Sequence, residues 1–305
     1  MIQNILILGG GSAGFITAIT LKKRIPHLSV KVLRSPEIGI IGVGEGSTPA
    51  LTIHLHGYLE IDPGEFYREA LPSWKLGIRF LWGPRPFFNY TFNRQYDTQF
   101  NILKYVTGYY CDDDCRCADI ASTLMEHEKV SVRVENGGPY IGSDIAYHLE
   151  NETFVAYLEK VALRLGVVIE DGTVENVVRN GDQIEALISN SGQRYEADLF
   201  VDCSGFRSYL LGQTLGEPFI PFKESLYCNR AVVGGWAREE EVVKPYTTAE
   251  TMDSGWCWQI EHEHRINRGY VYSSDFISDS AAEEEFRRKN PKITKTRVVP
   301  YVSGR

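Results

Sequence analysis

The chain has 305 residues, of which 43% are hydrophobic and 24% charged, and its formal net charge is −8 at pH 7. That length suffices for one large domain or two ordinary ones, each with a sizeable core. The acidic balance and the lack of a basic stripe exclude a typical nucleic-acid binder. No apolar run reaches the roughly 18 residues of a membrane-spanning helix.

The compartment follows from the N-terminus and the cysteines. The first apolar run leads directly into a glycine turn, with no secretory signal before it. We therefore expect a cytoplasmic protein that contacts no membrane and keeps its six cysteines reduced. Three of them, Cys111, Cys115 and Cys117, form the one cluster with metal potential. A structural zinc site needs a further pair at a distance, so we predict a loop with free thiols and no metal.

The first segment with functional content is residues 5–14, Ile-Leu-Ile-Leu-Gly-Gly-Gly-Ser-Ala-Gly. A buried strand is followed by the Gly-x-Gly-x-x-Gly spacing, and residues 15–23 then read as a helix that ends before Pro26. Such a turn brings backbone close to a pyrophosphate, and amides at the helix N-terminus face the anion. The predicted contacts are Gly9, Gly11, Ser12, Ala13 and Gly14. The alternative is a glycine-rich turn that binds nothing.

The second strand, residues 30–33, ends at Arg34, where a Rossmann unit often has an acidic residue for the ribose. Arg34 could pair with a 2′-phosphate, as in NADP, lie against an adenine ring, or be an ordinary exposed arginine. A second glycine-rich stretch follows at Gly42, Gly44 and Gly46. Three glycines in five residues let backbone approach a flat ligand closely, although a plain loop would read the same.

These segments resemble the flavin-dependent tryptophan halogenases. That family begins with Gly-x-Gly-x-x-Gly and continues with a Ser-Pro-x-Ile segment, here residues 35–38, and a Gly-Val-Gly-Glu-x-Thr-x-Pro loop, here residues 42–49. The resemblance implies that Gly42, Val43, Gly44 and Glu45 contact FAD. The family usually has Glu at the position of Arg34, which leaves the adenosine contact open.

Residues 74–82 carry the candidate catalytic group. Their period-2 pattern places Lys75 and Arg79 on one face and residues 76, 78, 80 and 82 on the other. By that pattern alone Lys75 is an exposed strand residue. The resemblance implies a different role, because the family's Lys-Leu-x-x-Arg-Phe segment carries the lysine that holds or reacts with the oxidised halogen. A lysine enclosed by aromatic walls has a lowered pKa. The aromatic residues at 87–92 and 105–110 form either core or a pocket for a flat substrate.

The middle of the chain reads as a helix from residue 152 to near Gly166, then strands at 167–170, 174–178, 184–188 and 199–202, with a hairpin turn at Gly181. The last strand runs into Asp202-Cys203-Ser204-Gly205, which resembles the family's Asp-Cys-Ser-Gly-x-Arg. Asp202 and Gly205 are therefore predicted beside the dinucleotide. We expect Gly11 and Gly205 to meet over one pyrophosphate.

Near the end of the chain, alternation puts Trp256, Trp258 and Ile260 on one face of a strand. This stretch resembles the family's Trp-x-Trp-x-Ile-Pro, with Glu261 in place of the proline. The resemblance implies that the two tryptophans lie on the substrate side, beside the flavin, and keep organic substrate away from the oxidant. A tryptophan pair in an ordinary core is the alternative, and Glu261 leaves room for a halogenase-like protein with another reaction.

We expect an α/β fold, with a Rossmann-like FAD-binding sheet of the glutathione-reductase type, a β-meander and a second, substrate-side β-sheet. The predicted nucleotide core is residues 1–50 and 150–212, and the substrate-side region is 51–149 and 213–305. The implied function is halogenation of a tryptophan- or indole-like aromatic with reduced FAD as cosubstrate, O2 and halide. A separate flavin reductase would supply the reduced FAD, and a homodimer stays open.

The resemblance covers the whole chain but only the first part of a family member. Family members continue with a second flavin-binding strand, a halide loop and a helical region over the substrate. We therefore expect weakened flavin retention and little halogenation by residues 1–305 alone. An aromatic monooxygenase and a non-catalytic flavoprotein remnant are the alternatives to a halogenase.

Overall fold

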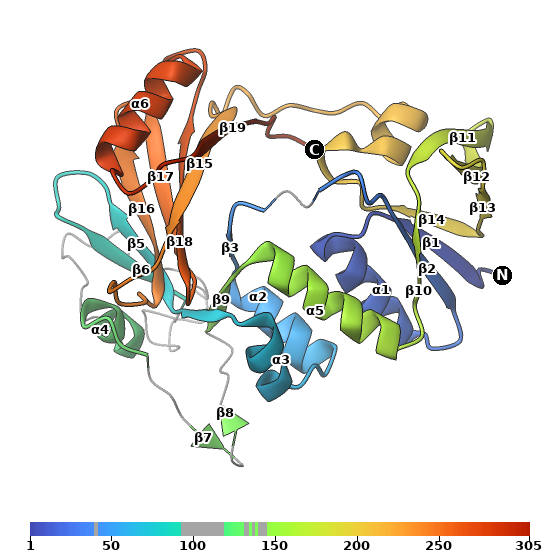
Figure 1. The fold of residues 1–305 in the computed structure, drawn as a ribbon, viewed down its shortest axis with the longest axis horizontal. Helices are drawn as coiled ribbons and strands as arrows, with labels where there is room; N and C mark the ends of the chain where they lie inside the picture. The colour runs from blue at the N-terminus through green and yellow to red at the C-terminus, as the bar shows by residue number, and fades with distance from the viewer. Residues whose placement is uncertain (40–41, 93–118, 131–133, 136–137, 140–144) are drawn as a thin grey trace, which may run out of the picture. The chain divides into compact units, whose positions relative to one another are not determined.

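The computed structural model describes residues 1–39, 42–92, 119–130, 134–135, 138–139 and 145–305 (Figure 1). The chain forms two compact units, each of which is discontinuous in sequence. Unit 1 comprises residues 1–41, 151–220 and 305, and unit 2 comprises residues 42–150 and 221–304. Cys111, Cys115, Cys117 and the aromatic residues at 105–110 lie outside the described residues.

Unit 1 is built on a parallel four-stranded sheet, as predicted. Its strand order is β10 (Val168–Asp171), β2 (Ser29–Arg34), β1 (Asn4–Leu8) and β14 (Leu199–Asp202). Ile5 to Leu8 are all buried, which explains the unbroken apolar run, because a central parallel strand is covered on both faces. The helices α1 (Ser12–Arg24) and α5 (Asn151–Arg164) pack against each other.

The predicted β-meander is confirmed in unit 1. It consists of β11 (Val174–Asn180), β12 (Gln183–Ser189) and β13 (Arg194–Glu196), paired antiparallel. Gly181 makes the hairpin turn with a φ of +60°, a conformation that favours glycine. Leu187 and Tyr195 of the meander pack with Leu6 and Leu33 of the sheet in one buried cluster. A 3-10 helix (Gly205–Arg207) and a π-helix (Tyr209–Thr214) follow β14.

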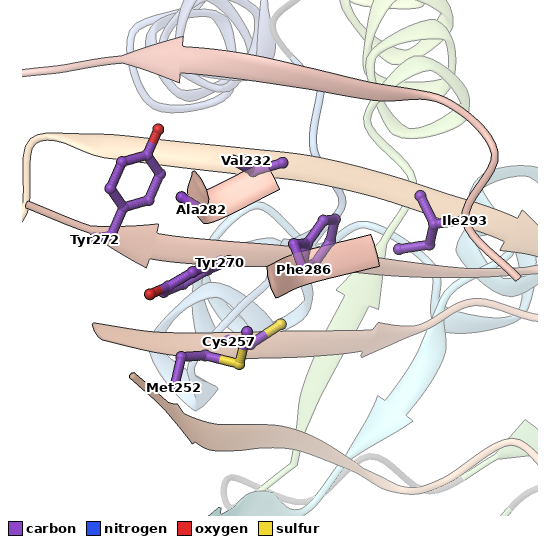
Figure 2. Close-up of a cluster of buried hydrophobic side chains, with 8 residues drawn as sticks. All are labelled: Val232, Met252, Cys257, Tyr270, Tyr272, Ala282, Phe286 and Ile293. Atoms are coloured by element: carbon purple, nitrogen blue, oxygen red, sulfur yellow. The ribbon is translucent and has the colours of Figure 1, made fainter. Parts of the chain in front are cut away.

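Unit 2 contains a seven-stranded sheet. The order is β19 (Thr296–Pro300), β15 (Arg230–Ala237), β18 (Arg265–Tyr272), β17 (Gly255–Glu261), β16 (Tyr246–Met252), β5 (Gly77–Leu81) and β6 (Phe88–Thr91). Only the β16–β5 pair is parallel among these described strands. Helix α6 (Asp279–Lys289) covers one face, where Ala282 and Phe286 pack over Val232, Cys257 and Tyr270 (Figure 2).

A smaller sheet in unit 2 carries the candidate lysine. It has the order β3 (Glu45–Gly46), β9 (Ala146–Leu149) and β4 (Ser73–Lys75), with β9 antiparallel to both neighbours and buried along its whole length. Between β3 and β4 lie α2 (Pro49–Thr52), a π-helix (Ile53–Tyr58) and α3 (Pro63–Ala70). The side chain of Asp62 caps α3 by accepting from the Glu65 amide at 2.7 Å.

The described residues of unit 2 also include three short elements, α4 (Ile120–Glu126), β7 (Val134–Glu135) and β8 (Gly138–Pro139). Helix α4 begins at a capping box, in which Asp119 and Ser122 each bond the other's backbone amide. In the part of the chain that the structure describes, no helix has both the length and the apolar character needed to cross a bilayer.

Candidate functional site

The two glycine turns of unit 1 lie side by side at the carboxyl edge of the parallel sheet. Strands β1 and β14 are neighbours in register, with Leu8 opposite Asp202. The Cys203 amide donates to the Leu8 carbonyl at 2.8 Å, and a Cβ on Gly9 would lie 2.2 Å from the Cys203 carbonyl oxygen. Gly9 also has a φ of +124°. Only glycine therefore fits at position 9, where the two turns approach each other this closely.

The other glycines of the first turn differ in what surrounds them. A Cβ on Gly14 would lie 1.9 Å from the Gly9 carbonyl oxygen, so Gly14 is needed for close packing of α1 on the turn. Around Gly11, in contrast, nothing lies within 4 Å of such a Cβ. Gly11 has an ordinary extended backbone, with a φ of −89°. The space beside Gly11 is open, which is what a ligand at this turn requires.

The N-terminus of α1 fits an anion. Gly11 is its N-cap, no side chain of the described residues caps it, and its first turn contains no acidic residue. Its first amides, including those of Ser12 and Ala13, therefore face outward with the positive end of a 13-residue helix behind them. The Ser12 hydroxyl is directed to Asn151 Oδ1 at 3.3 Å, at the start of α5. This arrangement is the usual setting of a nucleotide pyrophosphate.

Asp202 organises the second glycine turn from within. Its Oδ1 accepts from the Ser204 amide at 3.0 Å, and its Oδ2 accepts from the amides of Leu210 at 2.7 Å and Leu211 at 3.0 Å. Burial opposes ionisation of Asp202, but these donors outweigh it and lower the pKa of the carboxyl. The carboxylate therefore fixes the loop that presents Gly205, which has a φ of +66° and open space around it.

Arg34 is engaged by two carboxylates of unit 1. Its Nε lies 2.7 Å from Asp171 Oδ1 and its Nη1 lies 2.6 Å from Glu159 Oε2. The bond to Asp171, assisted by Glu159, outweighs partial burial and raises the pKa of the guanidinium. A 2′-phosphate would have to compete with both carboxylates for this cation, so the geometry disfavours that alternative and leaves contact with an adenine ring open.

Unit 2 contains a cavity of about 450 Å³, a volume in the range of small-molecule sites. Its walls come from β3, β4, β5, β16 and β17 and are mostly apolar or aromatic. They comprise Val43, Gly44, Glu45, Gly46, Lys75, Ile78, Phe80, Trp82, Thr247, Ala249, Trp256, Trp258 and Ile260. Trp256, Trp258 and Ile260 thus share a face, as their alternation predicts. Trp258 lies across Gly269 of β18, where a Cβ would approach its ring to 2.3 Å.

Lys75 lies in this cavity with only 4% of its surface exposed, so the pattern-based prediction of an exposed strand lysine is wrong. The alternation fails because the strand is interrupted at Leu76, between β4 and β5, and the lysine then turns to the same side as Ile78 and Phe80. Its Nζ donates to the Ser47 carbonyl at 3.0 Å and lies 5.6 Å from the centre of the Phe92 ring. Burial lowers the pKa of Lys75 to about 8.

The glycine loop before β3 is shaped by its neighbours. Gly44 has a φ of +84°, and a Cβ there would lie 2.8 Å from Asn267 Nδ2 and 2.9 Å from His262 Nε2. Gly44 can therefore be replaced by no other residue without strain. The consecutive residues Val43, Gly44 and Glu45 reach the cavity, and Gly42 precedes them on the exposed side.

Glu261 has a structural role in unit 2. It is 1% exposed, and one carboxylate oxygen forms an ion pair of 2.5 Å with Arg238 Nη2. The other accepts from Gln259 Nε2 at 2.6 Å. Glu261 is not among the cavity-lining residues. The proline-to-glutamate difference therefore gives no support to a change of reaction.

Sequence reasoning missed the polar residues behind the cavity. His148, on the buried strand β9, bonds Ser73 through Nδ1 at 3.3 Å and Thr247 through Nε2 at 2.8 Å. A single histidine in an apolar strand and two isolated hydroxyl residues give no pattern that would link them. Among the described residues, no group of three His, Cys, Asp or Glu side chains could hold a metal ion.

The parallel sheet with two glycine turns at one edge defines an α/β protein with a Rossmann-like nucleotide-binding fold. Within that class, the chain belongs to the tryptophan halogenase family, whose family model matches residues 4–305.

Curated relatives include tryptophan 7-halogenase RebH of Lentzea aerocolonigenes, 32% identical over 93% of this chain and 58% of that protein. Tryptophan 6-halogenase ThaL of Streptomyces albogriseolus is 31% identical over 94% of this chain and 59% of that protein. Among solved structures, the lathipeptide tryptophan 5-halogenase MibH superposes with a TM-score of 0.87 at 39% identity, over 100% of this chain and 59% of that one. The chain thus spans just under three fifths of the length of each of these relatives.

Proposed function

We propose that this chain takes part in FAD-dependent halogenation of an aromatic, tryptophan- or indole-like substrate, with reduced FAD, O2 and halide as the other reactants. A separate flavin reductase supplies the reduced FAD. The observation that carries the proposal is the burial of a single amine, Lys75, in an aromatic-walled cavity of unit 2. The three relatives named above are each described as tryptophan halogenases, which supports the same reaction class.

The contribution of unit 1 in this proposal is to bind the FAD pyrophosphate. The amides of Ser12 and Ala13 would meet its charge, and the open backbone at Gly11 and Gly205 would let it approach. Gly9 and Gly14 make the turn possible, and Asp202 holds the second loop in place. Arg34 lies one strand away, at the end of β2, where the adenosine of a dinucleotide is usually bound.

The contribution of unit 2 is to control the oxidant. Bound reduced FAD supplies, with O2, the oxidising equivalent that turns halide into hypohalous acid. Lys75 can hold that acid by donating a hydrogen bond, since the amine lies in a cavity with Trp82, Trp256 and Trp258. These rings would limit the access of water, which preserves the reactive acid, and they give the cavity an apolar wall for an aromatic partner. Val43, Gly44 and Glu45 complete the wall and are proposed to face the flavin.

The pyrophosphate assignment is tested with Gly11→Asp. An aspartate is a favoured N-cap residue and position 11 has room for it, so the folded chain should be as stable as the wild type or slightly more so. Its charge would repel the pyrophosphate, and we expect the FAD dissociation constant to rise at least tenfold. Gln183→Glu adds the same charge on the exposed meander and should change nothing. Equal FAD binding by Gly11→Asp and wild type would refute the assignment.

The reaction is tested by supplying reduced FAD, O2 and tryptophan or indole, with and without bromide, and identifying products by mass spectrometry. We expect a brominated product in the presence of bromide, in low yield because residues 1–305 span only part of the length of the relatives. Lys75→Met should lose it while retaining FAD binding, because Lys75 acts on the oxidant and not on the pyrophosphate. A product that gains oxygen without bromide, and no halogen with it, would instead establish an aromatic hydroxylase.

A further inference from the structure

Ser47 lies at the junction where the chain leaves the small sheet of unit 2 and enters a helix. Strand β3 ends at Gly46, and α2 begins at Pro49. The register of β3 on β9 pairs Gly46 with His148, so the next step along both strands brings Ser47 opposite Tyr147. In an antiparallel sheet, the two residues of a hydrogen-bonded pair exchange two bonds, in which each amide donates to the carbonyl of the other residue.

In the described structure, the backbone of Ser47 makes one of these two bonds. Its amide donates to the Tyr147 carbonyl at 2.8 Å, which identifies the two residues as a hydrogen-bonded pair. The Tyr147 amide donates instead to the Ser47 hydroxyl oxygen, at 2.9 Å. The side chain of Ser47 thus takes the place of its own carbonyl in the ladder. The pairing with Tyr147 is kept although the backbone is leaving the sheet.

The carbonyl of Ser47 that is released in this way accepts from Lys75. The Lys75 Nζ, one of the groups that line the cavity, donates to this carbonyl at 3.0 Å. The direction of the bond is fixed, because a carbonyl oxygen can only accept and an ammonium group can only donate. The bond involves a charged donor in a cavity with mostly apolar walls, and it therefore holds the amine more strongly than the same bond would in water.

Lys75 reaches Ser47 across β9. That strand lies between β3 and β4, and Lys75 on β4 is opposite Ala146 on β9. The two outer strands are two strand spacings apart, about 9.6 Å, so the lysine side chain has to be extended to bridge them. Gly46 leaves room for its tip, because a Cβ there would lie 3.2 Å from the Nζ. An extended side chain that is bonded at its tip has little freedom, and the Ser47 carbonyl therefore fixes the position of the amine.

We propose that Ser47 is a positioning residue for Lys75, whose hydroxyl takes over the ladder bond to Tyr147 and so keeps the Ser47 carbonyl on the lysine amine. Tyr147 is completely buried, and its amide needs a partner. Without the hydroxyl, that amide draws the carbonyl back into the ladder and away from Lys75. This assignment stands on the hydrogen bonds alone. Its consequence for catalysis rests on the proposed function: an amine held in one place donates to hypohalous acid in a fixed direction.

The first test reads both bonds in the unmodified chain by NMR. Scalar coupling through a hydrogen bond links an amide nitrogen to the carbonyl carbon of the group that accepts from it. We expect a coupling between the Ser47 nitrogen and the Tyr147 carbonyl carbon, and none between the Tyr147 nitrogen and the Ser47 carbonyl carbon. A missing first coupling, or a second one as strong as the first, would overturn the proposal. This measurement does not depend on the folding of any variant.

The second test removes the hydroxyl. Ser47→Ala should let the Tyr147 amide take the backbone carbonyl, so that Lys75 loses its acceptor and its ammonium form becomes less stable. The pKa of Lys75, about 8 in the wild type, should fall by about one pH unit, the equivalent of one hydrogen bond to a charged group. Carbon-13 NMR of lysine-labelled protein measures this pKa, with the signal assigned through Lys75→Met. Ser47→Thr keeps a hydroxyl on the same carbon and should keep the wild-type pKa.

The matched control is Thr48→Ala, which removes the hydroxyl of the next residue. Thr48 is exposed and its side chain does not cap α2, so the Lys75 pKa should stay unchanged. Three outcomes would overturn the role of Ser47: an unchanged pKa in Ser47→Ala, an equal fall in Ser47→Thr, or an equal fall in the control. The NMR readouts involve no flavin, halide or turnover. A failure of the halogenation proposal would therefore show in the bromide assay alone, and a failure of this inference in the NMR spectra alone.

Discussion

The burial of Lys75 predicts a specific dependence of stability on pH. The perturbation is Lys75→Met, which replaces the amine by an unbranched apolar side chain of similar length. In the folded chain the lysine is 4% exposed and its pKa is about 8, against 10.5 for a solvated lysine. At pH 7 the folded state must therefore hold a charge in a mostly apolar cavity.

The sign of this pH dependence follows from which state, folded or unfolded, binds more protons. Between pH 8 and pH 10.5 the unfolded lysine is protonated and the folded one is not, so the free energy of unfolding rises with pH in that window. From pH 7 to pH 10 the rise amounts to about 2.5 kcal/mol for one group with these two pKa values. Lys75→Met lacks this contribution. The unfolding free energy of the wild type, relative to that of the variant, should therefore increase by about 2.5 kcal/mol.

The measurement is urea unfolding of both proteins at several pH values from 7 to 10, followed by circular dichroism. Tyrosines and other groups that titrate in this range cancel in the difference between wild type and variant. Lys295→Met removes an exposed amine and serves as the matched control, for which we expect no comparable gain. A difference between wild type and Lys75→Met that stays constant with pH would refute the claim that the amine is desolvated.

Two further predictions concern stability. Arg238→Met leaves the Glu261 carboxylate buried without its cation and should cost about 3–5 kcal/mol of unfolding free energy. Replacing both residues by Met should recover most of the loss. Urea unfolding measures both variants, and a loss well below about 3 kcal/mol in Arg238→Met would contradict the prediction. Gly14→Ala forces a Cβ against the Gly9 carbonyl oxygen and should lower the melting temperature by several degrees, while Gly11→Ala, which has room, should change it little. Equal melting temperatures for the two glycine variants would count against the described turn.

The parallel sheet, the meander and the paired glycine turns could be predicted from the sequence because each rests on local signals. Ile5 to Leu8 is an apolar run that only a covered strand explains, and Gly181 lies at a turn that requires a positive φ. The sequence also predicts that the two glycine turns lie together, and the β1–β14 pairing places them side by side, with Gly9 against Cys203. Periodicity is therefore enough to predict a strand or a turn where the neighbouring elements bury the same residues that the segment's own pattern selects.

The environment of Lys75 could not be predicted by periodicity. An interruption of one residue at Leu76 reversed the side to which the lysine points, and nothing local marks that break. His148, Ser73 and Thr247 lie on three different strands far apart in the sequence. Only the resemblance to a known family indicated an enclosed Lys75, because a family motif records tertiary contacts that a pattern of alternation does not.

The two faces of β17 explain how the core beneath α6 holds the aromatic wall of the cavity in place. Trp256, Trp258 and Ile260 line the cavity, while Cys257, between the tryptophans, is fully buried in the cluster beneath α6 (Figure 2). Because alternate residues point to opposite faces, a slip of one residue would place a tryptophan in that tight core. The packing of Phe286 and Tyr270 therefore fixes the register of the strand. Through the register it fixes the aromatic wall around Lys75, so the core under α6 serves the site without touching it.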